Sequence, residues 1–113
     1  MKFTNILKDL TYNDDKVAIT VLFETDSTKE IRIAFKAGQL MKKHQTSFPI
    51  TVEMVEGVLD FGVEDTIHHL VKGDLVALDG GVPHDLVAKE DSIVRLTLSK
   101  KDTVSRVKAV INS

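Results

Sequence analysis

Between Lys16 and Leu98 the chain is a succession of short runs in which apolar and polar residues alternate. The runs cover residues 17–23, 31–36, 52–61, 66–71, 75–78, 84–88 and 93–98. A period of two is typical of β-strands that bury one face, and no long helical pattern lies between these runs. About eight short strands in this arrangement predict an all-β, antiparallel sandwich or barrel rather than a parallel sheet.

Turn residues separate the runs. They are Glu24–Thr28, Gly38, Lys72–Asp74, Asp79–Gly81 and Lys89–Asp91. Glu64–Asp65 is a candidate two-residue hairpin turn, and Glu56–Gly57 interrupts the apolar run from Val52 to Phe61.

The two ends of the chain differ from this pattern. Residues 1–15 carry apolar side chains at mixed spacing, which allows either a short helix or an irregular arm. Near the other end, Asp102 is a plausible helix N-cap, and apolar residues follow at helical spacing at Val104, Val107, Val110 and Ile111. A short C-terminal helix over about 102–111 is therefore expected to pack on the barrel or on a second subunit.

Composition narrows the class of protein. The chain has 113 residues, 42% of them hydrophobic, and a formal net charge of -2, which predicts one globular domain over 1–113. Its Lys and Arg residues are scattered, so neither nucleic acid nor an anionic membrane is an expected partner. No segment resembles a signal peptide or membrane span, which favours a cytoplasmic location. The absence of cysteine excludes disulfides and thiolate chemistry.

Two glycine- and histidine-containing spacings resemble the two motifs of the cupin family, a match that covers about residues 30–99. The first consists of Gly38, His44, Thr46 and Gly57, and the second of Gly73, Gly81, Pro83 and His84. The resemblance implies a double-stranded β-helix, or jelly-roll, barrel similar to RmlC-like proteins, with a ligand pocket inside.

The metal-ligand positions that the resemblance implies are only half filled. They read His44, Thr46, Ile50 and His84 in this chain, where the family pattern has three histidines and a carboxylate. A threonine hydroxyl is a poor ligand for a divalent ion and isoleucine has no lone pair. A divalent metal (Fe, Mn, Ni or Zn) would therefore be held weakly by two imidazoles, and the sequence assigns no definite cofactor.

The other polar residues near the motifs are less favoured as metal ligands or ligand contacts. His68 and His69 are adjacent, so they point to opposite faces of a strand and cannot both bind one ion; surface positions without a role are expected for them. By the same alternation, Gln45 and Asp85 lie outside the barrel. Asp79 precedes two glycines, which suits either a local turn or a loop carboxylate that reaches a ligand.

Strand parity from the two motif histidines predicts the lining of the pocket. The residues expected there are His44, Thr46, Ile50, Val52, Met54, Phe61, His84, Leu86 and Ala88. Phe35 and Phe48 either complete this lining or belong to the ordinary core. A mostly apolar wall with two imidazoles and one hydroxyl suits a small, largely apolar ligand with a polar tip.

Two classes of function remain open. One is a small cupin that binds a small, largely apolar molecule in an internal pocket and is metal-poor or binds metal weakly through two histidines. The alternative is a metal-dependent enzyme of the dioxygenase or isomerase type that uses His44 and His84. Whether catalysis occurs is left open. By analogy with small cupins, a homodimer is expected, in which the N-terminal arm and the C-terminal helix gain burial.

Overall fold

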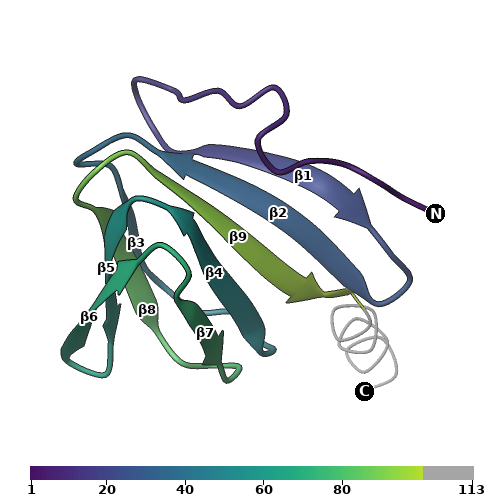
Figure 1. Ribbon diagram of the computed structural model, residues 1–113. Helices are drawn as coiled ribbons and strands as arrows, with labels where there is room; N and C mark the ends of the chain where they lie inside the picture. The colour runs from purple at the N-terminus through teal and green to yellow at the C-terminus, as the bar shows by residue number, and fades with distance from the viewer. Residues whose placement is uncertain (101–113) are drawn as a thin grey trace, which may run out of the picture.

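The computed structural model describes residues 1–100, which form an all-β structure of two antiparallel sheets (Figure 1). Its strands are β1 (Ala18–Glu24), β2 (Thr28–Phe35), β3 (Leu40–His44), β4 (Ile50–Glu56), β5 (Val58–Val63), β6 (Thr66–Val71), β7 (Leu75–Leu78), β8 (His84–Ala88) and β9 (Ser92–Ser99). One sheet has the order β1-β2-β9-β4-β7 and the other the order β3-β8-β5-β6. This arrangement confirms the predicted jelly roll. The predicted C-terminal helix lies outside the described residues.

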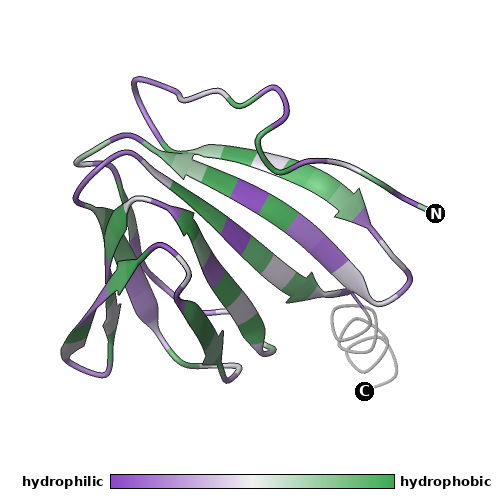
Figure 2. Cartoon of the chain, in the orientation of Figure 1, coloured by the Kyte–Doolittle hydropathy of each residue, from purple (hydrophilic) through white to green (hydrophobic). Residues whose placement is uncertain are grey.

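The alternating pattern of each strand builds the core between the sheets. Figure 2 shows the alternation of apolar and polar residues along β2, β9 and β4. On β2, Ile31, Ile33 and Phe35 point into the core, and the side chains of Phe61 and Met54 come to meet them from β5 and β4. Burial of such large apolar side chains stabilises a fold by roughly 1.5–3 kcal/mol each.

Two of the predicted turns have the backbone that their positions require. Glu64 and Asp65 have φ values of 51° and 64°, and Val63 pairs with Thr66, so a two-residue hairpin joins β5 to β6 as predicted. The apolar run from Val52 to Phe61 is divided at Gly57, whose φ is 96°. There the chain leaves the five-stranded sheet and enters the other one.

The N-terminal segment is an arm with turns and no strand, which settles the alternative left open by its sequence. It runs along the outer face of the first sheet, above β1 and β2 in Figure 1. Arg32 fastens it, because its Nη1 donates to the carbonyl oxygens of Ile6 and Lys8 at 2.8 and 2.9 Å. Further along the arm, Asp14 forms an ion pair with Lys36.

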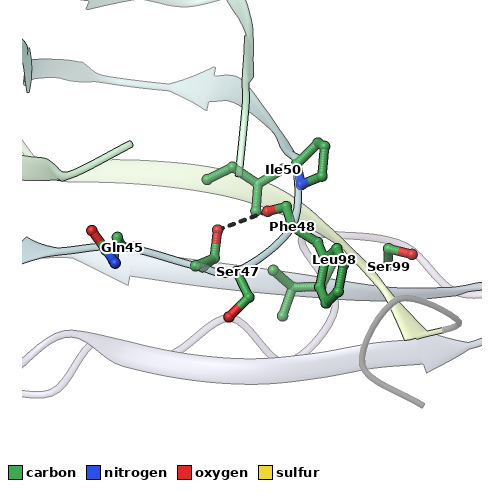
Figure 3. A pocket seen from close by; sticks show the side chains of 8 residues that line it. Gln45, Ser47, Phe48, Ile50, Leu98 and Ser99 are labelled. Atoms are coloured by element: carbon green, nitrogen blue, oxygen red, sulfur yellow. Dashed lines mark hydrogen bonds between the residues drawn. The ribbon is translucent and has the colours of Figure 1, made fainter. Parts of the chain in front are cut away.

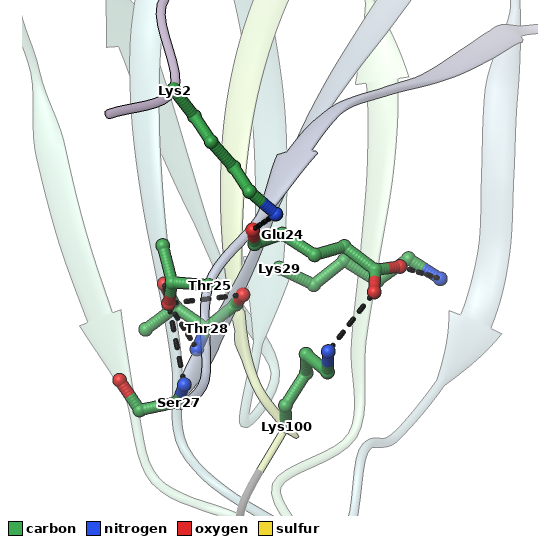
Figure 4. A network of polar contacts seen from close by, with 7 residues as sticks. All are labelled: Lys2, Glu24, Thr25, Ser27, Thr28, Lys29 and Lys100. Atoms are coloured by element: carbon green, nitrogen blue, oxygen red, sulfur yellow. Dashed lines mark hydrogen bonds and ion pairs between the residues drawn. The ribbon is translucent and has the colours of Figure 1, made fainter.

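A polar network joins three segments at the end of the five-stranded sheet that carries the β1–β2 turn (Figure 4). Lys2 donates to the backbone oxygen of Glu24, whose carboxylate pairs with Lys100 at 3.1 Å and with Lys29 at 3.7 Å. The Lys100 contact is the main reason that the pKa of Glu24 is held below its usual value. The start of the chain, the β1–β2 turn and the end of β9 are thereby linked.

The edge strand β1 carries exposed apolar side chains. Ile19 pairs with Ile33 and Val21 with Ile31, so their side chains belong to the apolar face of the sheet, yet they are 58% and 48% exposed. Such a face suits a second copy of the chain, and the homodimer stays a prediction.

Within residues 1–100, no helix has the length and hydrophobicity to cross a membrane.

Candidate functional site

Two imidazole rings from different strands meet between the sheets. β3 and β8 pair in antiparallel register with His44 opposite His84. Their ring centroids are 4.4 Å apart with an interplanar angle of 58°. On the other side of His84, the ring of Phe61 stacks at 5.6 Å and 14°, and His84 is only 2% exposed. The convergence of the two motif histidines is therefore present in the structure.

An irregularity in β3 sets the direction of His44. Met41 pairs with Leu86 and His44 with His84, so three steps on β3 match two steps on β8. A bulge of this kind inserts one residue and reverses the facing of the residues after it. Met41 and His44 therefore both face inward, although plain alternation would have placed them on opposite faces.

The three polar side chains of the site, His44, Thr46 and His84, each donate a hydrogen bond to a backbone carbonyl. Nδ1 of His44 lies 2.7 Å from the oxygen of Lys42, and Nδ1 of His84 lies 3.0 Å from that of Val82. A carbonyl oxygen only accepts, so Nδ1 carries the hydrogen, and Nε2 of the neutral ring is an acceptor. The hydroxyl of Thr46 likewise donates to the oxygen of Phe48 at 2.9 Å. The site thus offers acceptors to a ligand.

These groups surround a cavity of about 40 Å³. It is lined by Ile33, Met41, His44, Thr46, Ile50, Val52, Phe61, His84, Leu86 and Leu96. Met54 and Ala88, which parity also placed in the lining, are buried in the core but do not line this cavity. The cavity has room for a water molecule or one small polar group. It is therefore too small to enclose the whole apolar ligand that the sequence predicts.

Three residues that line the cavity are not among those that strand parity predicts. Met41 is hidden by the bulge, for which β3 carries no clear sequence signal. Ile33 and Leu96 do have a signal. Ile33 alternates with Arg32 and the small Ala34 on β2, and Leu96 lies between Arg95 and Thr97 on β9, so both lie on the apolar face of their strands.

The donor set does not fit a resident metal with three or four protein ligands. Besides the two imidazoles, the cavity offers the Thr46 hydroxyl and apolar side chains, among them Ile50 at the carboxylate position of the motif. Within residues 1–100, His, Asp and Glu side chains do not gather in groups of three or more that could hold an ion.

The other sequence candidates lie away from this cavity. Asp79 is exposed in the turn before Gly80. Gln45 borders an outer groove, and Asp85 lies against Gly62 on the neighbouring strand. His68 pairs with Phe61 and so shares its inward face near the β6–β7 edges.

His69 points to the opposite face of β6, where its Nδ1 contacts the carboxylate of Asp60 at 2.5 Å. Lys89 adds an ion pair to the same carboxylate at 3.6 Å. The hydrogen bond from His69 is the main cause that lowers the pKa of Asp60.

This lowered pKa predicts a pH-dependent contribution to stability. A carboxylate with a folded pKa below its unfolded value of about 3.9 stabilises the fold above that value, and the contribution is lost as the pH falls through the folded pKa. Urea unfolding should therefore show Asp60→Asn less stable than the wild type at pH 5.5, with the difference shrinking at pH 3. A difference that is equal at both pH values would contradict this role of the carboxylate.

A second hollow adjoins the cavity at the β3–β4 loop (Figure 3). It measures about 260 Å³ and shares Thr46 and Ile50 with the cavity. We call it the outer groove; it is lined by Gln45, Thr46, Ser47, Phe48, Pro49, Ile50, Leu98 and Ser99. Phe48, which the sequence left between pocket and core, belongs to this groove, whereas Phe35 is in the core.

Comparison with solved structures finds the same architecture in cupins. An RmlC-like cupin from Desulfovibrio desulfuricans is 24% identical, with a TM-score of 0.80 over 88% of this chain and 96% of that one. KdgF from Halomonas sp. is 22% identical, with a TM-score of 0.75 over 88% and 92%. A cupin superfamily protein from Desulfitobacterium hafniense is 13% identical, with a TM-score of 0.74 over 80% and 83%. No protein-family model and no curated protein matches the sequence.

Proposed function

We propose that this protein, whose fold is that of the cupins, binds a small and largely apolar molecule through a hydrogen-bond donor on that molecule. The observation that carries the proposal is the state of the three polar side chains in the cavity. His44, His84 and Thr46 each direct their hydrogen to a backbone carbonyl, so they present lone pairs to a ligand. A hydroxyl or amino group satisfies such lone pairs, whereas an ether or carbonyl group does not.

The apolar surroundings strengthen this preference. His84 is 2% exposed and Phe61 is 1% exposed, so the site is largely shielded from water. A buried polar group without a partner costs roughly 1–3 kcal/mol, which gives a donor group a clear advantage over an acceptor of similar size. Inward Arg and Lys side chains are lacking among the residues that line the cavity, so anionic groups are disfavoured.

The proposal predicts discrimination between ligands that differ only in their polar group. Benzyl alcohol and aniline carry donors and are uncharged at neutral pH, and anisole has a similar body with an acceptor only. We expect the first two to bind at least about tenfold more tightly than anisole, measured by titration with NMR detection. The preference should disappear in His44→Ala and His84→Ala, and it should persist in His69→Ala, whose imidazole lies on the outer face. Equal affinity for all three molecules in the wild type would refute the proposal.

The second candidate function is weak binding of a divalent cation at the same two imidazoles. Metal-binding histidines commonly donate their other ring nitrogen to a carbonyl, as His44 and His84 do here. With only two such ligands from the protein, water would complete the coordination and the ion would exchange readily. This state would underlie the metal-dependent enzyme that the family resemblance suggests.

A further inference from the structure

The cavity between the imidazoles is too small for the whole ligand. Its volume of about 40 Å³ accommodates a hydroxyl or amino group but not an apolar body. If the proposed function holds, the body must lie in an adjoining space, and the location inferred for it rests on that function.

A larger apolar space lies on the open side of the sandwich. β6 and β7 are edge strands of different sheets, and a cleft of about 410 Å³ lies at these two edges. We call it the β6–β7 cleft; it is lined by Phe61, Val63, His68, Leu70, Leu75, Val76, Ala77 and Leu78. His68 is the one imidazole in this otherwise apolar lining.

A single side chain belongs to both spaces. Among the residues that line them, only Phe61 is common to the β6–β7 cleft and the cavity. Its ring stacks on His84 and has no polar atom, so rotation of the ring breaks no hydrogen bond. The ring of Phe61 therefore stands between the cleft and the imidazole pair.

The outer groove is a less favourable route to the same pair. It adjoins the cavity at Thr46, whose hydroxyl donates to the Phe48 oxygen and whose backbone oxygen accepts from the Gly81 nitrogen at 2.7 Å. A ligand that entered from the outer groove would have to displace Thr46 and break these two hydrogen bonds. The groove is also smaller, at about 260 Å³.

We propose that the β6–β7 cleft holds the apolar body of the ligand, while its donor group passes Phe61 to reach His44 and His84. The ligand class is a flat aromatic or short aliphatic molecule with one hydroxyl or amino group at its end. His68 lies on the same face as Phe61, so its ring borders the body in the cleft.

The test uses benzyl alcohol as the probe and two matched variants of β6. His68→Trp fills the cleft from an exposed strand position, whereas His69→Trp places the same bulk on the opposite face of the neighbouring residue. We expect NMR titration to give a loss of affinity of at least about tenfold for His68→Trp and less than about twofold for His69→Trp. In the wild type, the probe should shift the ring signals of His68, Phe61 and His84 together.

The outcomes separate this inference from the function on which it rests. If His84→Ala weakens the probe and His68→Trp does not, the cleft is refuted as the site of the body and the imidazole pair stands. If His68→Trp abolishes binding and His84→Ala leaves it unchanged, the cleft binds on its own, and both the link through Phe61 and the proposed function are wrong. No detectable binding of the probe to the wild type would overturn the inference as well.

Discussion

Replacement of Gly57 by alanine should destabilise the protein by about 3–5 kcal/mol, an effect in the upper range for a single substitution. Two causes act together. The φ of Gly57 is 96°, which a residue with a Cβ adopts only under strain. An added Cβ would also lie 2.7 Å from the Cα of Ser92 and still closer to the backbone oxygen of Asp91, and backbone atoms cannot move aside as a flexible side chain does.

Gly73→Ala is the matched control for this prediction. Gly73 has a similar φ of 94°, but a Cβ there would meet no atom within 4 Å. Its replacement should therefore cost only the backbone strain, about 1–2 kcal/mol. Urea unfolding of both variants separates the two causes, and equal losses would show that the close approach of β9 to Gly57 is unimportant.

Replacement of Arg32 by methionine should release the N-terminal arm and reduce the free energy of unfolding by about 2–3 kcal/mol. Arg32 is 2% exposed, and its guanidinium donates to the carbonyls of Ile6 and Lys8 with a longer contact to that of Asp9. Hydrogen bonds from a charged donor are stronger than neutral ones. Methionine replaces the aliphatic part of the arginine side chain but has no donor, so the arm would lose these contacts.

Arg95 provides the control, because it lies opposite Arg32 in the register of β2 and β9. Its side chain is 45% exposed and pairs with Glu53 at 3.0 Å, an exposed ion pair of the kind that contributes about 0–1 kcal/mol. Arg95→Met should therefore have a small effect. Limited trypsin digestion should cleave the arm at Lys8 or Lys16 faster in Arg32→Met than in the wild type or Arg95→Met. Equal cleavage rates would contradict the role of Arg32 as the anchor.

Most of the strands are predictable from local sequence because each buries one face and is bounded by a turn residue. Val17–Phe23, Ile31–Lys36 and His84–Ala88 were predicted within a few residues of β1, β2 and β8. The path of residues 1–15 was not predictable, because it depends on Arg32, a charged side chain that local patterns place in solvent. Its burial needs three carbonyl oxygens from a segment more than 20 residues away.

The site was predictable in part, because the sequence motifs and the alternation of side chains along strands are local features. His44 and His84 converge because two motifs place them on paired strands, and parity carried their neighbours Leu86 and Val52 into the lining. Parity fails at a bulge, so Met41 was missed. It also says nothing about volume or about hydrogen-bond direction, which depend on packing around Phe61 and on the local backbone. The small cavity and its acceptor character therefore emerged only from the structure.

The most direct test of the imidazole pair as a site for a donor ligand, rather than for a resident metal, is the metal content of the purified protein. The protein would be prepared without chelator and without a histidine tag, and analysed by mass spectrometry beside His44→Ala and His84→Ala. We predict metal far below stoichiometric amounts in all three proteins, because two imidazoles hold a divalent ion only weakly. Near-stoichiometric metal in the wild type that is lost in both variants would contradict this assignment and favour a metal-dependent cupin.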